Sequence, residues 1–455
     1  MENKLNLEIK IISKETIKPS TPTPLHLNTF KLSLIDQIFP AFHIPLLLFY
    51  NNTPPNTLPP QITTLKSSLS HTLSQFYPLA GRCIDDSTVS CNDEGIPFFE
   101  THVNSRLTEF LSSLKKLDSL TQFLPPREFL ALGPRPISEL VPLALQINVF
   151  ACGGVVIGCY MLHKFLDTSS LGTFFQYWAA IATQRYDDVA HPVFDATVKA
   201  FPPSPSMERV IVPDLSGTND PPTNSPRVVV LVKSFRLTKT SITNLKAMAV
   251  SGTLPNPTSF ETVAGFIWES VVAAACIARA AARDPVPEMT VFSITINMRS
   301  RTNPPIPTQS MGNCITDVQA KAAKQGTLPE LVAEIHETVS KTKSKIEKFQ
   351  GVNGVEELRE DRKEASRFVM EDNANVYQVS SWCKLGLNVA DFGFGKPNWI
   401  IPTDGIVPVA LRNFIFFTDY YDDLNEGIEV WLFLEEKEMQ VLETNPRFLE
   451  FASPC

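Results

Sequence analysis

The chain has 455 residues and a formal net charge of −8; 43% of its residues are hydrophobic and 19% are charged. This composition is typical of a globular protein and excludes a disordered or fibrous chain, and the negative charge argues against nucleic acid or an anionic membrane as a partner. Because a single hydrophobic core stops growing at about 250 to 300 residues, we expect two domains.

The N-terminus and the cysteines predict a cytoplasmic protein. The first eight residues are charged and contain no apolar signal core. The eight cysteines include no Cys-x-x-Cys pair, and several have apolar neighbours, as free buried thiols do. A reducing, cytoplasmic setting is therefore expected.

The first clear element is a helix. Leu65, Leu69, Leu73 and Phe76 follow helical spacing, so we expect an amphipathic helix over 64–76. Pro78 and Gly81 follow directly and should end the helix there.

The next element is the uncharged stretch 140–162, which is long enough to suggest a membrane span. It contains Pro142, Asn148 and the pair Gly153-Gly154, which disfavour a lipid-facing helix. Two buried strands joined by a turn at the glycines explain it better, so we expect no membrane contact.

Residues 201–227 have the composition of a linker, with seven prolines among Ser, Thr, Asn and Asp. We expect an N-terminal domain over 1–200, a crossover at 201–227 and a C-terminal domain over 228–455. The second domain opens with 228–232, a run of Val and Leu that predicts a buried strand.

Two helices are predicted in the second half. Thr258 and Glu261 have the spacing of a capping box, and the helix after them should end near Arg283, before a proline. A second amphipathic helix is expected over 328–349. Strands and helices alternate in both halves, which predicts an α/β fold.

Two short motifs carry the functional prediction. The first is His163–Asp167, a histidine with an acid four residues later, placed directly after the apolar stretch. The second is Asp391–Pro397, an aromatic loop that begins with an acid and contains Gly393 and Gly395. The glycines allow positive φ angles and therefore tight turns.

Together, in this order, the motifs resemble those of the plant BAHD acyltransferases, acyl-CoA-dependent enzymes that acylate alcohols and amines of secondary metabolites. The similarity is greatest to the family's alkaloid acetyltransferase branch. Further matches are Pro19–Pro24, Leu32–Gln37, Phe76–Arg82, Cys152–Gly154, Asn297–Arg301, Met311–Asn313 and Ser380–Trp382. The resemblance implies an α/β fold of two similar-sized chloramphenicol acetyltransferase-like domains with a channel between them.

The resemblance assigns His163 the role of general base. Histidine suits this role because its ordinary pKa lies near the working pH. It would deprotonate the acceptor and then pass the proton to the departing CoA thiolate, so no acyl-enzyme is expected. A lone histidine after an apolar strand is more often a core residue, and it is the second motif together with the surrounding matches that favours catalysis here.

Asp167 allows two interpretations. It could orient His163 as in a catalytic triad, or, as the resemblance implies, pair with Arg299 and shape the loop; we favour the structural role. One histidine and one acid do not make a zinc site, so no metal is expected.

The remaining candidate site residues come from the second half. The resemblance implies that Asp391 holds the domains and the CoA channel in shape, although its loss could also abolish activity. Trp382 and Ser380 match family positions near the reacting carbonyl. Either could donate a hydrogen bond to the oxyanion, or both could serve packing alone.

Three positions depart from the usual family motifs: Leu162, Thr168 and Phe394 stand where Ser, Gly and Trp are common. They motivate an alternative, a non-catalytic or altered-activity small-molecule binder with the same fold. An α/β-hydrolase esterase is remote, because no Gly-x-Ser-x-Gly is present.

The expected ligands are an acyl-CoA co-substrate and a hydrophobic alcohol, bound by a monomer with no permanent cofactor. The segment 413–429 has no Lys or Arg, whereas a dicarboxylic acyl group would require a cation, so acetyl-CoA is favoured. Thirty phenylalanines suit a bulky acceptor, and the resemblance suggests an alkaloid, for example a monoterpene indole alkaloid. The residues that contact CoA are not predicted.

Overall fold

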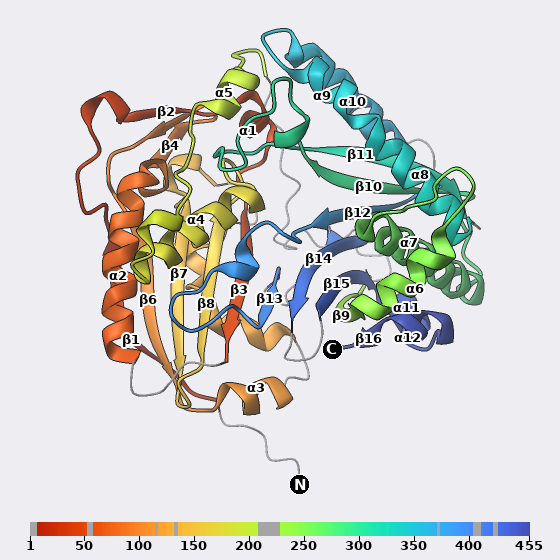
Figure 1. Ribbon diagram of the computed structural model, residues 1–455, viewed down its shortest axis with the longest axis horizontal. Coiled ribbons are helices and arrows are strands. Elements are labelled where there is room, and N and C mark those ends of the chain that lie inside the picture. The colour runs from red at the N-terminus through yellow and green to blue at the C-terminus, as the bar shows by residue number, and fades with distance from the viewer. Residues whose placement is uncertain are drawn as a thin grey trace, which may run out of the picture. The chain divides into compact units, whose positions relative to one another are not determined.

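In the computed structural model the chain forms two compact units, each described here by itself (Figure 1). Unit 1 comprises Met1–Thr218, Ile306–Cys314 and Lys384–Ile406, and unit 2 comprises Asn219–Pro305, Ile315–Cys383 and Val407–Cys455. The structure describes residues 7–51, 58–113, 117–131, 135–207, 228–324, 326–370, 374–403, 411–421 and 426–455. Most of the predicted linker 201–227 lies outside these ranges.

A six-stranded mixed sheet forms the centre of unit 1. Across the sheet the strands are β1 (Ile9–Ile17), β6 (Ile96–Val103), β7 (Leu143–Phe150), β8 (Val155–Leu162), β3 (His43–Tyr50) and β13 (Trp399–Ile401). Only the β6–β7 pair is parallel. A small second sheet consists of β2 (Thr29–Lys31), β5 (Thr88–Ser90) and β4 (Arg82–Asp85).

The helices of unit 1 include the predicted amphipathic helix. They are α1 (Leu34–Ile38), α2 (Leu58–Gln75), α3 (Leu107–Ser113), α4 (Thr168–Ala182) and α5 (Ala196–Ala200). The predicted segment 64–76 coincides with most of α2. The Trp178 indole N–H of α4 donates to the Leu65 carbonyl of α2 at 3.1 Å, which ties the two long helices together.

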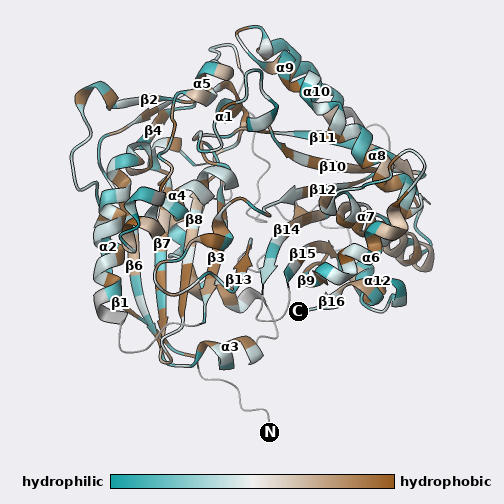
Figure 2. Cartoon of the chain, viewed as in Figure 1, coloured by the Kyte–Doolittle hydropathy of each residue, from teal (hydrophilic) through white to brown (hydrophobic). Residues whose placement is uncertain are grey.

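The uncharged stretch 140–162 forms two strands, as predicted. β7 and β8 are antiparallel neighbours, and β8 is buried along its whole length. Gly153 in the connecting turn has φ +91°, a conformation that suits glycine. Figure 2 shows the hydrophobic residues concentrated along β8 and β3.

One prediction about domain membership is wrong. The second domain was expected over 228–455, but residues 306–314 and 384–406 of that range belong to unit 1. Residues 311–312 contact Thr197 and Ser170 of unit 1 through hydrogen bonds. Residues 384–406 contain the Asp391 loop. The reason is strand pairing: β13 pairs antiparallel with β3, with Ile400 opposite Leu48, and so extends the unit 1 sheet (Figure 1). The channel expected between the two domains stays a prediction.

Unit 2 is built on a seven-stranded mixed sheet. Its strands, in order, are β11 (Ile315–Ala323), β10 (Met289–Asn297), β12 (Asn375–Ser381), β14 (Phe414–Tyr421), β15 (Glu426–Glu435), β9 (Val230–Thr238) and β16 (Ser453–Pro454). Its helices are α6 (Lys239–Ala249), α7 (Ser259–Ala282), α8 (Leu328–Ser340), α9 (Thr342–Phe349), α10 (Gly354–Met370), α11 (Glu436–Leu442) and α12 (Pro446–Phe451). Both units thus show the predicted α/β character.

The long helix α7 forms as predicted. Thr258 and Glu261 make the capping box, and the helix ends at Arg283 in a left-handed conformation. Among the described residues this is the one helix long and apolar enough to cross a membrane, judged by length and composition alone. Two thirds of its apolar window is buried inside the protein, as in the core helix of a globular domain.

Two predicted elements of unit 2 differ in detail. The segment 328–349 is two helices rather than one, because the chain turns at Lys341 between α8 and α9. The strand predicted at 228–232 begins at Val230, and its first residues are only half-buried. β16 pairs with β9 only at Phe235 and Arg236, so within the described ranges the start of β9 has no strand beside it on that side.

Candidate active site

His163 lies at the end of β8, as predicted, in the turn that follows the buried strand. Its backbone N–H donates to the Phe42 carbonyl at 2.8 Å. Its ring stacks on Phe39, with 4.7 Å between centroids and 13° between planes, and a tilted contact with Phe42 lies at 5.4 Å. The imidazole is half-buried between two aromatic rings.

The next residue, Lys164, stabilises the segment that carries Phe39. Lys164 is 3% exposed, and its Nζ donates to the carbonyls of Gln37 (3.1 Å) and Phe39 (3.2 Å), with Asp86 Oδ1 at 3.7 Å. Gln37 lies in the last turn of α1 and Phe39 is its C-cap, and the helix dipole favours a cation at this end. Lys164 therefore fixes the residue on which the His163 ring stacks.

Asp167 is the N-cap of α4 and is 1% exposed. Oδ1 accepts from the Ser170 backbone N–H at 2.8 Å, and Oδ2 accepts from the Cys314 N–H at 3.0 Å. One carboxylate thus satisfies the start of a helix and a residue 147 positions later in the chain. Asp167 therefore joins the start of α4 to Cys314.

The segment 311–314, which we call the clamp segment, packs against several elements of unit 1. Met311 O accepts from Thr197 Oγ1 at 2.8 Å, and Gly312 O accepts from Ser170 Oγ at 2.9 Å. Asn313 Nδ2 donates to the His163 carbonyl at 2.8 Å. The clamp segment therefore joins α4, α5 and the His163 turn.

Asp36 anchors the clamp segment from α1. Its Oδ1 accepts from the Asn313 N–H (2.6 Å) and Nδ2 (3.1 Å), and its Oδ2 accepts from the Ser33 N–H (2.9 Å) and Oγ (2.7 Å). Burial raises the pKa of Asp36 to about 6, although these hydrogen bonds oppose the shift. A buried carboxyl is tolerated here because both oxygens have donors.

The Asp391 loop is closed by its own acid. Asp391 Oδ1 accepts from the N–H groups of Gly393 (2.8 Å) and Gly395 (2.9 Å), and both glycines have positive φ, at +90° and +84°. Arg185 donates to the Asp391 carbonyl at 3.1 Å. The loop geometry thus agrees with the predicted turns and with a structural role for the acid.

The aromatic residues of the loop are buried in unit 1. Phe392 contacts Trp178 edge-on at 4.7 Å, and Phe394 contacts Tyr50 edge-on at 5.7 Å. Of the other two departures from the family motifs, Leu162 is buried at the end of β8 and Thr168 is the first residue of α4. All three departures therefore affect packing.

The other predicted site residues belong to unit 2. Arg299 is buried, and its backbone N–H donates to Asn297 Oδ1 at 3.1 Å. Ser380 is half-buried in β12, and Trp382 packs edge-on against Phe416 at 5.4 Å. The predicted pairing of Asp167 with Arg299 and the roles of Ser380 and Trp382 stay predictions, because these residues lie in different units from His163 and Asp167.

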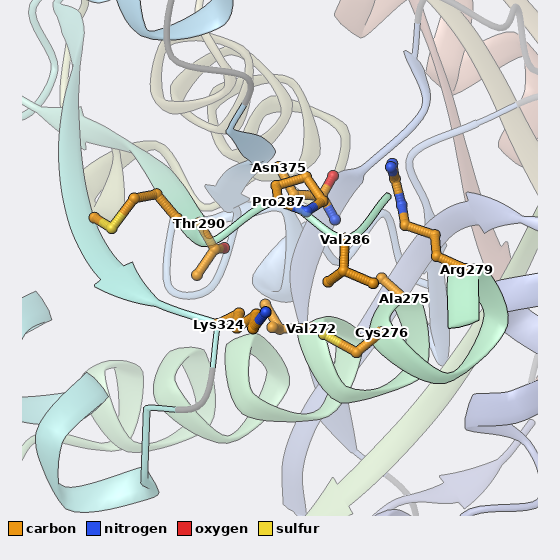
Figure 3. Close-up of a pocket in the computed structure, with 10 residues that line it drawn as sticks. Val272, Ala275, Cys276, Arg279, Val286, Pro287, Thr290, Lys324 and Asn375 are labelled. Carbon is orange, nitrogen blue, oxygen red and sulfur yellow. The ribbon is translucent and has the colours of Figure 1, made fainter. Parts of the chain in front are cut away.

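Two further features bear on binding chemistry. No three His, Cys, Asp or Glu side chains of the described ranges come together as a metal site would require. A cavity of about 10 Å³ beside α7 has room for about one water (Figure 3). Its polar neighbours are already bonded: Thr290 accepts from Trp268, and Asn375 donates to Tyr377, so the cavity is a packing void.

Three residues around His163 were missed by sequence reasoning: Asp36, Lys164 and Asn313. Ser33 and Asp36 have the spacing of a capping box, and the box is present. That pattern predicts a helix start but not the contact to Asn313, which lies 277 positions away. Met311–Asn313 was recognised as a family match without a function.

The comparisons with known proteins cover nearly the whole chain. A family model described as the Transferase family matches residues 7–449. Akuammiline synthase 2 of Alstonia scholaris is 32% identical, with 98% of this chain and 97% of the relative covered. Stemmadenine O-acetyltransferase of Catharanthus roseus is 33% identical, with 96% and 97% covered.

Solved structures agree with these relatives. The crystal structure of vinorine synthase, an enzyme of Rauvolfia serpentina, has a TM-score of 0.79 at 32% identity and covers 98% of this chain and 99% of that chain. TRI101 of F. sporotrichioides, at 16% identity and a TM-score of 0.68, covers 94% and 99% and shows the same fold. The predicted two-domain fold is confirmed. The chain is therefore an acyltransferase of the plant BAHD family, similar to its alkaloid acetyltransferases.

Proposed function

We propose that this enzyme transfers an acetyl group from acetyl-CoA to a hydroxyl group of a polycyclic alkaloid, with His163 as the general base. The observation that carries the proposal is the placement of His163. It is the one residue of its motif that is half-exposed in a turn directly after a buried strand, held by backbone contacts and stacked on Phe39.

The proposed reaction needs one base and no covalent enzyme intermediate. His163 removes the proton of the acceptor hydroxyl as its oxygen attacks the thioester carbonyl, and a tetrahedral oxyanion forms. Collapse of this intermediate breaks the carbon–sulfur bond, and the imidazolium returns the proton to the CoA sulfur. The products are the acetyl ester and free CoA, so the histidine ends in its starting state.

The acids of both motifs are proposed to support the site without taking part in proton transfer. Both oxygens of Asp167 already accept backbone N–H groups, and Asp391 accepts two within its own loop. The proposed donors to the oxyanion are Trp382 and Ser380. Arg299 is proposed to pair with Asp167.

The substrate classes rest on sequence and relatives. Stemmadenine O-acetyltransferase, vinorine synthase and salutaridinol 7-O-acetyltransferase, the last of Papaver somniferum at 32% identity, support an alkaloid alcohol. The lack of Lys and Arg in 413–429 supports acetyl over malonyl, because a buried carboxylate without a partner would cost several kcal/mol. All eight cysteines are free, which supports a reducing, cytoplasmic setting.

The decisive experiment replaces His163. With acetyl-CoA and a panel of polycyclic alcohols, followed by release of free thiol, His163→Ala is expected to lower turnover by at least roughly a hundredfold. His102→Ala, on an exposed position of β6, is the matched control and should leave turnover unchanged. A His163→Ala enzyme of normal rate and unchanged melting temperature would refute the assignment.

The donor is tested separately. Equimolar acetyl-CoA and malonyl-CoA compete for one acceptor, and mass spectrometry of the product gives the ratio. Acetylation should predominate, and predominant malonylation would overturn the proposed donor. If neither donor reacts with any alcohol of the panel while the alcohols still bind, the chain is a binder that retains the fold.

A further inference from the structure

Asn313 connects two features that are far apart in the sequence. Its side chain is fully buried, and Nδ2 donates both to the His163 carbonyl at 2.8 Å and to Asp36 Oδ1 at 3.1 Å. Its backbone N–H donates to the same carboxylate oxygen at 2.6 Å. Because both Nδ2 partners are pure acceptors, the orientation of the Asn313 amide is determined by the contacts themselves.

These contacts immobilise the backbone on both sides of the His163 side chain. The N–H before it is bound by the Phe42 carbonyl, and the carbonyl after it is bound by Asn313. With both peptide groups hydrogen-bonded, the backbone restrains the imidazole, and its remaining freedom is rotation of its own side chain. Phe39 stacked on one face and Phe42 against it restrict that rotation.

The clamp segment has little room to move. Gly312 has φ +106°, and a Cβ at this position would lie 3.2 Å from both Asp36 Oδ2 and Thr197 Oγ1. Asp36 is itself held by the Ser33 N–H and hydroxyl at the start of α1. The chain of contacts from Ser33 through Asp36 and Asn313 to His163 is therefore tight and buried.

We propose that Asn313, anchored by Asp36, is a positioning residue that holds the His163 imidazole in its reactive place. The inference rests on the proposed role of His163 as base and adds the residues that set its geometry. Displacement of a reacting group by about 1 Å can cost roughly a hundredfold in rate, and catalytic groups need support from hydrogen-bonded neighbours to stay in place.

The test compares two buried asparagines of unit 1. Asn148 on β7 is also fully buried, and its Nδ2 donates to the carbonyls of Phe123 (2.8 Å) and Val156 (3.0 Å), away from the His163 contacts. Asn313→Ala should lower kcat by about ten- to a hundredfold with KM for acetyl-CoA unchanged within about twofold. Asn148→Ala should lower the melting temperature while kcat stays within about twofold.

A second readout does not depend on turnover. The aromatic ring of Phe39 should shift the His163 ring protons to high field in the NMR spectrum of the full-length protein labelled on histidine. Phe39→Leu should abolish that shift, and Asn313→Ser, which retains one hydroxyl donor, should reduce it. The assignment of the signal comes from its absence in His163→Ala.

The outcomes separate the two proposals. If His163→Ala keeps its rate, the proposed function fails. If His163→Ala is inactive but Asn313→Ala matches Asn148→Ala in kcat, the positioning role is refuted while the base stands. Should Asn313→Ala not fold, Asn313→Ser decides: an unchanged His163 ring shift together with a normal kcat overturns the inference, and a reduced shift with a lowered kcat supports it.

Discussion

The two motif acids of unit 1 use the same chemistry in different surroundings. Asp167 and Asp391 each accept two backbone N–H groups. The N–H groups that donate to Asp167 belong to Ser170 and Cys314. Both residues are buried, and Cys314 lies 147 positions further along the chain. The donors to Asp391 are glycines two and four residues away, and both are exposed.

The contribution of a motif acid to stability therefore depends on whether its N–H donors can bond to water when the acid is removed. A buried N–H that loses its acceptor bears the full cost of desolvation, whereas an exposed one bonds to water. Asp167 therefore belongs to the tertiary structure of unit 1, and Asp391 to the local shape of one loop.

The largest effect is expected at Gly172, where the helix capped by Asp167 contacts the segment that precedes Asp391. α4 begins at Asp167, and a Cβ on Gly172 of that helix would lie 1.7 Å from the Leu385 carbonyl, in the segment before Asp391. Gly172→Ala should destabilise the protein by more than about 3 kcal/mol, although alanine normally favours a helix. Gly252→Ala, with no atom within 4 Å, is the control for thermal or denaturant unfolding. Equal stabilities of the two variants would show that α4 and this segment do not depend on each other.

Removal of Asp167 should have the next largest effect. Asp167→Ala leaves the N–H groups of Ser170 and Cys314 without their acceptor, and we expect a loss of about 2 to 4 kcal/mol of unfolding free energy, together with lower activity. Thr258→Ala, which removes an exposed N-cap at α7, should cost only about 1 kcal/mol. Lost activity with full stability would instead point to a triad role for Asp167.

Acid should lower the stability of unit 1 next to the His163–Asp167 motif through His43, which lies opposite Leu162 in the sheet. Its Nδ1 accepts from the Ala131 N–H and Nε2 bonds to the Val141 carbonyl, and burial lowers the pKa of His43 to about 4. The folded protein therefore binds this proton less readily than the unfolded chain. The resulting stability is present above pH 6.5 and is lost as the pH falls from about 6.5 towards 4.

His43→Gln keeps a donor and an acceptor but does not titrate, which isolates this contribution. Wild type should lose about 2 kcal/mol more than the variant between pH 7.5 and pH 5 in denaturant unfolding. The pKa of Asp36, raised to about 6, acts in the opposite sense between about pH 4 and 6, but it is common to both proteins and cancels in the difference. Parallel pH profiles would argue against a neutral His43.

The smallest effect on stability is expected at the Asp391 loop. Asp391→Ala releases the N–H groups of Gly393 and Gly395 to water, so stability should fall by no more than about 1 kcal/mol. Differential scanning calorimetry of this variant beside Asp167→Ala gives the direct comparison. A loss as large as that of Asp167→Ala would mean that burial of the donors is not what decides the cost.

Local sequence signals predicted much of this fold. The capping box at Thr258 placed α7 within one residue, and the glycine pair at 153–154 predicted the β7–β8 turn. The break at Lys341 was missed because the apolar spacing continues across it. The position of His163 after a strand and the closed Asp391 loop also followed from local pattern.

Long-range contacts could not be predicted in this way. The hydrogen bonds from Asn313 to Asp36 and His163 span 277 and 150 positions, and neither periodicity nor composition predicts them. Among the described residues, the outer side of β9 is paired by β16, a strand of two residues, Ser453 and Pro454. The membership of residues 384–406 in unit 1 depends on the β13–β3 pairing. The linker composition of 201–227 suggested instead that all residues after it belong to the second domain.

The β13–β3 pairing has a consequence for biosynthesis. On the ribosome, residues 1–200 emerge with β3 as an open sheet edge, and its partner strand appears only after about two hundred further residues have been made. Domains generally fold as units during synthesis, and exposed strand edges promote aggregation. A nascent or truncated N-terminal half would therefore lack both its sixth strand and Asn313, and we expect expression of that half alone to depend strongly on chaperones.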